Sequence, residues 1–118
     1  MATFTKRFLS GSVNGCGISV ISASGGTAGT AGTIHECSAG TSGKEEIWLW
    51  AYNSHTSDVV LSVEFGTSAL PRKVTIPSQA GLVPVIPGIP LNDGMKVQAF
   101  AGSAGVVVID GFVNQIVD

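Results

Sequence analysis

Residues 45–66, EEIWLWAYNSHTSDVVLSVEFG, contain the pattern that decides the fold. In 47–52, Ile, Leu and Ala alternate with Trp, Trp and Tyr, and in 59–65 every second residue is a large apolar one. This period-two alternation around the polar turn at 53–58 predicts a β-hairpin. The first strand is apolar on both faces, so we expect its second face to be covered by its own chain or by another copy.

Short extended segments lie on both sides of this stretch. We predict strands at 5–10, 17–22, 32–38, 72–76, 95–101 and 105–117, an edge strand or extended connection at the proline-rich 81–91, and no helix. The last two strands are expected to pair as a second hairpin with a bulge at Gly111. Eight or nine short strands indicate a single all-β domain over 1–118, an antiparallel β-sandwich of jelly-roll or immunoglobulin-like type.

The segment 22–33, SASGGTAGTAGT, has no apolar side chain larger than alanine and cannot contribute a core face. A phosphate-binding loop would need a lysine and a following helix, and this segment has neither. We expect a flexible loop, or an arm that orders against a neighbouring molecule. Its glycines are candidate contacts to a subunit or to a coat: Gly25, Gly26, Gly29 and Gly32.

The composition is poor in charge. Only 12% of the 118 residues are charged, the net charge is −2 and the mean hydropathy is +0.40. Such a surface favours an obligate oligomer or a structural assembly, because solvent-exposed protein surfaces are normally richer in charge. The six basic residues form no run longer than two, which argues against nucleic acid. No apolar run of 18 residues and no signal-peptide pattern occurs, so no membrane is expected.

Histidine and cysteine residues are the candidate metal ligands and redox centres. His35, Cys37 and His55 could ligate a metal, and His35 and Cys37 share a strand face, but Glu36 as a third ligand would point to the opposite face. Neither a CxxC nor an HxH motif is present, so no metal is predicted. Cys16 and Cys37 are too few for a disulfide framework. We expect two free thiols in a reducing cytosol, with a single 16–37 bridge as the alternative.

The acidic and histidine residues do not form a catalytic pattern. His55 and Asp58 lie in one turn, where such side chains usually bond their own backbone. Glu45 and Glu46 are adjacent and point to opposite faces, and Asp110 stands alone in an apolar strand. No GxSxG elbow occurs. We therefore predict a protein that is not an enzyme, with no cofactor and no small-molecule substrate.

The aromatic residues Trp48, Trp50 and Tyr52 share one face of their strand and are the main site candidates. They form either a stacking platform for a sugar or single-stranded nucleic acid, or a packed core or subunit interface. A platform needs polar groups that orient its ligand, and this strand face adds only Glu46. The sequence therefore favours core packing or an interface with a subunit or coat.

Four segments carry a resemblance to a known class of proteins: TFTKRFLSGSVNGCGI, GTIHECSAGTSGKEEIWLWAYNSHTSDVVLSVEFG, LVPVIPGIPLNDG and GFVNQIV. Together they resemble small all-β virion proteins of tailed bacteriophages, some of which are capsid cement (decoration) proteins. The resemblance implies a homotrimer on the outer capsid surface, made in the host cytoplasm, with the major capsid protein as partner. The alternatives are a tail or baseplate component, and a carbohydrate-binding β module.

Overall fold

The computed structural model describes residues 2–20, 33–65, 72–103 and 105–117. These residues form nine β-strands and no helix, which confirms the all-β prediction; no described segment is thus a helix able to cross a membrane. The strands are β1 (Thr3–Phe8), β2 (Ile18–Ser19), β3 (Thr33–Glu36), β4 (Gly43–Asn53), β5 (Val59–Phe65), β6 (Arg72–Ile76), β7 (Val83–Asn92), β8 (Lys96–Ala101) and β9 (Val107–Val117).

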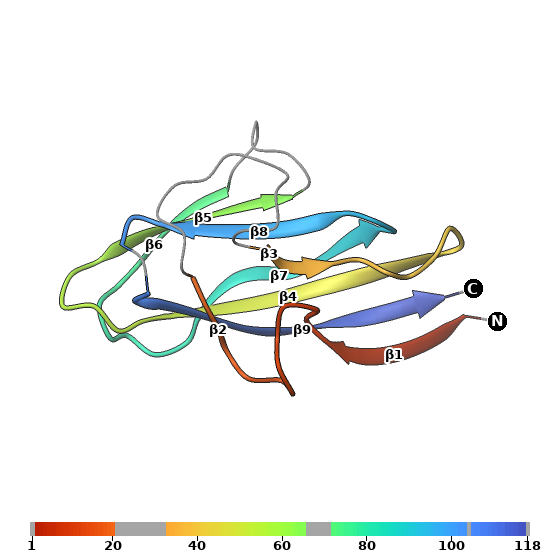
Figure 1. The fold of residues 1–118 in the computed structure, drawn as a ribbon, viewed down its shortest axis with the longest axis horizontal. Helices are drawn as coiled ribbons and strands as arrows, with labels where there is room; N and C mark the ends of the chain where they lie inside the picture. The colour runs from red at the N-terminus through yellow and green to blue at the C-terminus, as the bar shows by residue number, and fades with distance from the viewer. Residues whose placement is uncertain (1, 21–32, 66–71, 104, 118) are drawn as a thin grey trace.

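Two antiparallel sheets pack face to face (Figure 1). The first sheet has the order β1-β9-β4-β7, with β2 also pairing β9, and the second has the order β3-β8-β5-β6. The pairs β2/β9, β3/β8, β4/β7 and β5/β6 are nested, as if one long hairpin had been rolled up. This nesting is the jelly-roll arrangement, so the sandwich prediction is confirmed in its jelly-roll form.

Both predicted hairpins are wrong. β4 and β5 lie in different sheets, and so do β8 and β9, so neither pair forms a hairpin. Asn53 anchors the turn between β4 and β5, because its Nδ2 donates to the carbonyls of Ser57 (3.0 Å) and Ile76 (2.9 Å). Alternation reports which side chains face inward, and it carries no information on which strand supplies the hydrogen bonds.

The core lies between the inner faces of the two sheets. Along β4 every odd-numbered residue from 43 to 53 is buried, while the even-numbered ones remain at least partly exposed. Burying one large aliphatic side chain contributes about 1.5–3 kcal/mol. The fully enclosed residues come from both sheets: Ile47, Leu49, Ala51, Val107, Ile109 and Val113 from the first, and Leu61, Val63, Ile76, Val97 and Ala99 from the second.

The β4/β9 ladder is unbroken from Gly43↔Val117 to Asn53↔Val107. The predicted bulge at Gly111 is therefore wrong. Gly111 is required for a different reason, since a Cβ there would collide with the backbone oxygen of Trp48. Irregular register occurs instead between β4 and β7, and between β3 and β8. The unbroken ladder fixes which residues of β9 stand beside the aromatic residues of β4.

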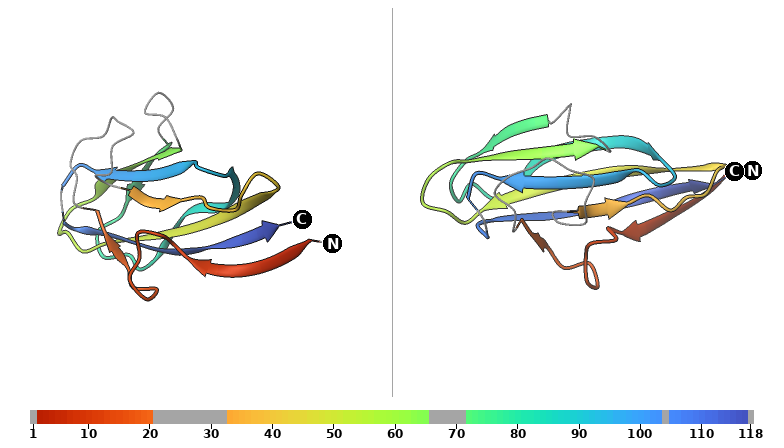
Figure 2. Two further views of the ribbon diagram at one scale, coloured as in Figure 1. Left: turned by 45° about the vertical axis from the view of Figure 1, so that its right-hand side comes forward. Right: turned by 45° about the horizontal axis from the view of Figure 1, so that its top comes forward.

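β1 and β7 are the two outer strands of the first sheet (Figure 2), and they differ in proline content and exposure. β7 forms one edge and carries Pro84, Pro87 and Pro90, as predicted for an edge strand, because proline cannot donate to a further ladder. β1 forms the other edge, contains no proline, and is exposed at all six residues. The open edge of this sheet is thus β1.

The glycine-rich arm and its four candidate glycines fall at 21–32, outside the described residues, and β3 begins at Thr33. The expectation of a flexible arm stays a prediction.

Candidate functional site

The register of β1, β9 and β4 assembles an aromatic face on the outer side of the first sheet. Phe8 lies opposite Phe112, which lies opposite Trp48. At the next position on the same face of each strand, Lys6 lies opposite Asn114, which lies opposite Glu46. Trp50 follows on the same face of β4. We define the aromatic face by these residues: Lys6, Phe8, Glu46, Trp48, Trp50, Phe112 and Asn114.

Three rings of this face are nearly parallel. Phe112 is inclined by 15° to Trp48 and by 27° to Trp50, with ring centroids 6.3 and 6.0 Å apart. Parallel rings on neighbouring strands favour each other through dispersion and their quadrupoles. All three are only partly exposed. We call Trp48, Trp50 and Phe112 the aromatic pavement.

Gly88 on β7 determines the orientation of the Trp48 indole ring. A Cβ placed on Gly88 would be 2.7, 3.0 and 3.1 Å from three consecutive atoms of the six-membered ring of the indole. A point in the plane of the ring, beyond its edge, would be much closer to the middle one of these three atoms than to the other two. Because the three distances are nearly equal, Gly88 lies over the face of the ring. The indole therefore lies with one face against β7, and only glycine, which also has φ +81° here, fits beneath it.

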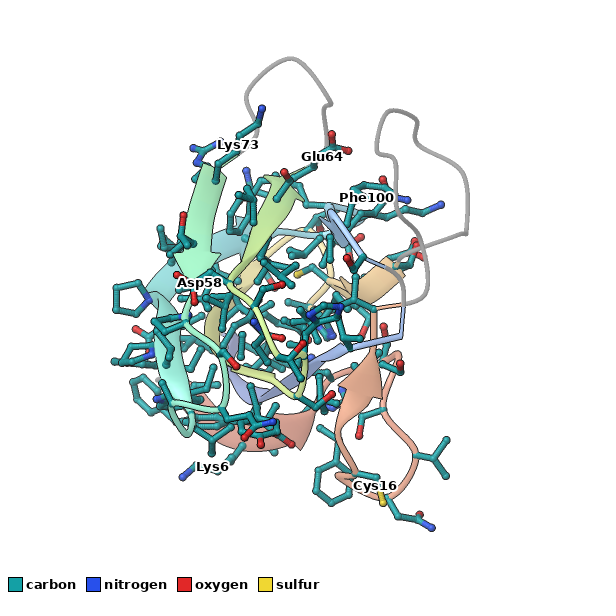
Figure 3. All side chains as sticks on the ribbon, turned by 90° about the vertical axis from the view of Figure 1, so that its left-hand side faces the viewer. Lys6, Cys16, Asp58, Glu64, Lys73 and Phe100 are labelled. Carbon is teal, nitrogen blue, oxygen red and sulfur yellow. The ribbon has the colours of Figure 1, made fainter. Side chains whose placement is uncertain are left out.

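Polar groups border the pavement on one side. Glu46 Oε1 accepts hydrogen bonds from Trp48 Nε1 (2.8 Å) and from Asn114 Nδ2 (3.3 Å), which fixes both side chains. The Lys6 ammonium lies over the Phe112 ring, 4.7 Å from its centroid, in a cation–π contact, so a ligand that stacks on Phe112 has to displace this flexible side chain; Figure 3 shows Lys6 projecting from the outer side of its sheet. Among the described residues, Glu46 Oε2 and Asn114 Oδ1 accept no hydrogen bond.

Exposed aromatic surface continues onto β1. The side chain of Phe4 is 71% exposed and that of Phe8 is 64% exposed. β1 is hydrogen-bonded to β9 alone, so these rings stand at the open edge of the molecule. Apolar side chains this exposed on the same face of one strand, on either side of Lys6, mark a contact surface.

The histidine considered as a metal ligand has a structural role. His35 Nδ1 accepts the Ser10 amide (2.9 Å), and its Nε2 donates to Glu45 Oε1 (2.5 Å). Gln115 Nε2 donates to the other oxygen of Glu45 (2.8 Å). Burial raises the pKa of Glu45, but the hydrogen bonds from His35 and Gln115 outweigh it and lower that pKa below its ordinary value. This cluster ties β3, β4, β9 and the segment after β1 together.

The remaining sequence candidates also have structural partners. Cys37 is buried and free, its Sγ donates to the Leu91 carbonyl (3.5 Å), and burial raises the pKa of its thiol. Cys16 is exposed and free, so the structure contains no 16–37 bridge. His55 Nδ1 accepts the Ser57 amide within its own turn, as predicted, whereas Asp58 Oδ1 accepts the amide of Ser78, which lies after β6. Within the described part of the chain no three potential ligands gather for a metal.

Sequence reasoning placed Trp48, Trp50 and Tyr52 on one face, and the structure confirms it. The pavement itself includes Phe112 in place of Tyr52, which lies opposite Val108. Phe112, Lys6 and Asn114 were missed, because their place beside Trp48 depends on the register of two ladders far apart in sequence. The signal available was the inward alternation of Val107, Ile109 and Val113, which puts the even-numbered residues of β9 on the outer side.

No protein-family model matches the chain, and no curated protein matches it in sequence. One solved structure with a similar backbone is the crystal structure of the GH26-CBM35 β-(1,4)-mannanase of Podospora anserina. The match has 16% sequence identity and a TM-score of 0.46, and it covers 96% of this chain and 27% of that chain. A likeness at this level carries no argument about function.

Proposed function

We propose that this chain is a structural protein of a tailed-bacteriophage virion, a cement protein that binds the outer capsid surface and stabilises the coat lattice. The observation that supports it best is β1, an open edge strand exposed at all six residues with Phe4 and Phe8 turned outward. Together with a charged fraction of only 12%, this favours a surface that becomes buried in an assembly. The partners would be the major capsid protein and further copies of this chain.

The charges on β1 favour a ring over a two-fold dimer. Lys6 and Arg7 occupy two of its six positions, so an antiparallel pair of two β1 strands would bring four basic residues together. A contact between β1 and a different surface of the neighbouring copy avoids this repulsion. Head-to-tail contacts form a closed ring where the rotation between neighbouring copies closes, and a homotrimer is the ring proposed here.

A cement protein stabilises a shell because it binds the assembled lattice and not the separated coat subunits. The gain per site is RT ln(1 + [L]/Kd), or about 2.7 kcal/mol at a hundredfold excess over Kd. Many sites per particle multiply this modest term. A weak contact at each site is therefore sufficient for the shell to resist heat and the pressure of packaged DNA.

To test this, the protein is stripped from phage particles, or its gene is deleted. Heat-induced DNA release from these particles is then measured with and without added protein. Wild-type protein should raise the release temperature, while the F4S/F8S double variant should not. Val60→Ser is the matched control, because Val60 is 46% exposed on the second sheet and outside β1. Bare particles that are equally robust, or binding to tails alone, would replace the cement assignment with a tail or baseplate role.

A second candidate function, carbohydrate binding, is favoured by the aromatic pavement. Flat-lying rings bordered by oriented polar groups suit the apolar faces and hydroxyls of a sugar. Asn114 and Lys6 supply the polar groups that β4 alone lacks. The experiment is migration of the folded protein in native gels that contain soluble polysaccharide, where binding retards wild type and not the W48A/W50A variant.

A further inference from the structure

The shape of the pavement limits which carbohydrate it can hold. Trp48 lies flat over Gly88, and Phe112 is inclined by 15° to Trp48 and by 27° to Trp50. Two hollows among the described residues border β1 and the start of β4, and none of the three pavement residues lines either of them. The three rings are instead partly exposed on the outer face of the first sheet. A flat surface suits internal units of a glycan that runs across it.

The orientation of the rings favours a ribbon-like glycan. A group of rings inclined by small angles gains most from a ligand that presents its apolar C–H faces in one plane over several units. Equatorially linked pyranose chains, such as β-1,4-glucans, have this shape, whereas α-1,4-linked chains coil and turn their faces away. The pavement thus selects by chain shape.

The charges beside the pavement favour a neutral ligand. Lys6 contributes one positive charge, and Glu46 and Asp110, which lies opposite Trp50, contribute two negative ones, so the surroundings of the rings disfavour a polyanionic glycan. Glu46 Oε1 holds the Trp48 indole and the Asn114 amide in place, while Glu46 Oε2 and Asn114 Oδ1 accept no hydrogen bond from the described residues. Both oxygens are acceptors for hydroxyl donors, and Lys6 is a donor.

We propose that the pavement of Trp48, Trp50 and Phe112 binds internal units of a neutral, equatorially linked glycan ribbon, with Glu46 and Asn114 accepting its hydroxyls. The proposal rests on carbohydrate binding, the second candidate function, and is independent of the capsid assignment. The two surfaces are adjacent and separable, since Phe4 stands on β1 and the tryptophans on β4.

The test uses cellohexaose as the ribbon, maltohexaose as the coiled isomer and hexagalacturonate as the charged chain. Trp48 and Trp50 are the two tryptophans of the chain, so intrinsic fluorescence reports directly on the site. Cellohexaose should shift the emission to shorter wavelength and bind at least about tenfold more tightly than either of the others. Calorimetry on the same samples gives the dissociation constants.

Variants assign the contacts. Trp48→Ala and Trp50→Ala should each weaken cellohexaose binding by about tenfold or more, and Asn114→Ala by less, because one ring contact exceeds one neutral hydrogen bond here. Phe4→Ser and Val60→Ser should leave it unchanged. If Trp48→Ala fails to fold, Trp48→Phe, which keeps a smaller flat ring, should show an intermediate loss.

The outcomes distinguish carbohydrate binding in general from selectivity for a neutral, ribbon-like glycan. Equal or tighter binding of maltohexaose or hexagalacturonate overturns the neutral ribbon and leaves carbohydrate binding in place. No binding of any of the three overturns both. Loss of particle binding in the tryptophan variants, without any glycan binding, makes the pavement a protein interface.

Discussion

At the scale of single residues, Glu45 is the most informative titratable group. It is fully buried and paired with His35 and Gln115, and these partners lower its pKa below the ordinary value. A carboxyl with a lowered folded-state pKa stabilises the fold at pH above its unfolded pKa, and this contribution is lost as the pH falls through the folded pKa. The fold should therefore lose stability on the acid side of an ordinary carboxyl pKa.

The variant Glu45→Gln tests this. At neutral pH it should lower the free energy of unfolding by about 2 kcal/mol, the value of hydrogen bonds to a charged group. The difference from wild type should shrink in acid, where Glu45 of wild type is itself protonated. Urea unfolding at several pH values measures it. Glu36→Gln, at an exposed position of β3, is the control, and an equal effect there would contradict the role given to Glu45.

Gly88 and Gly94 form a matched pair for the flat orientation of Trp48. Both have positive φ, +81° and +84°, but a Cβ on Gly94 would meet nothing within 4 Å, whereas one on Gly88 would press into the indole. Each alanine substitution should cost about 1–2 kcal/mol from the backbone alone. Gly88→Ala should cost more and should shift the tryptophan emission to longer wavelength. Identical results for the two variants would mean that Trp48 does not rest on Gly88.

At the scale of elements, the strands divide into those that hold the fold and one that presents a surface. β4 is central in its sheet and buries alternate residues, whereas all six residues of β1 are exposed. Leu49→Ala should therefore cost about 2–5 kcal/mol of unfolding free energy. Phe4→Ala should stay within about 0.5 kcal/mol. Thermal and urea unfolding compare them, and a large loss in Phe4→Ala would place β1 within the cooperative core.

The same division explains what could be predicted from sequence. Alternation in β4 correctly separated Leu49 from Trp48, and the prolines of 81–91 correctly indicated an edge, because both are local signals. Strand pairing is not local. The turns after Asn53 and after Ala101 were therefore predicted as hairpins although the strands that flank each of them lie in different sheets. Phe112 was missed as a neighbour of Trp48 for the same reason, since their pairing joins positions 64 residues apart.

At the scale of the whole molecule, the sparse charge makes a specific prediction for the virion contact. With eight acidic and six basic residues in the chain, and Phe4 and Phe8 at the proposed surface, the contact is chiefly apolar. Its affinity should change by less than about threefold between low and moderate salt. Sedimentation of protein with stripped particles measures this. A steep loss of binding with salt would instead identify Lys6 and Arg7 as the main contacts.

The difference between β7 and β1 limits how many strands from other molecules can be added to the first sheet. Prolines at 84, 87 and 90 prevent β7 from receiving another strand in register, so the first sheet can be extended only beside β1. On the β1 side, only the two-residue β2 lies beside β9 in addition to β1. Addition of strands to this sheet therefore cannot continue from copy to copy through β7. The molecule can join a closed shell at high local concentration without seeding fibres along this sheet.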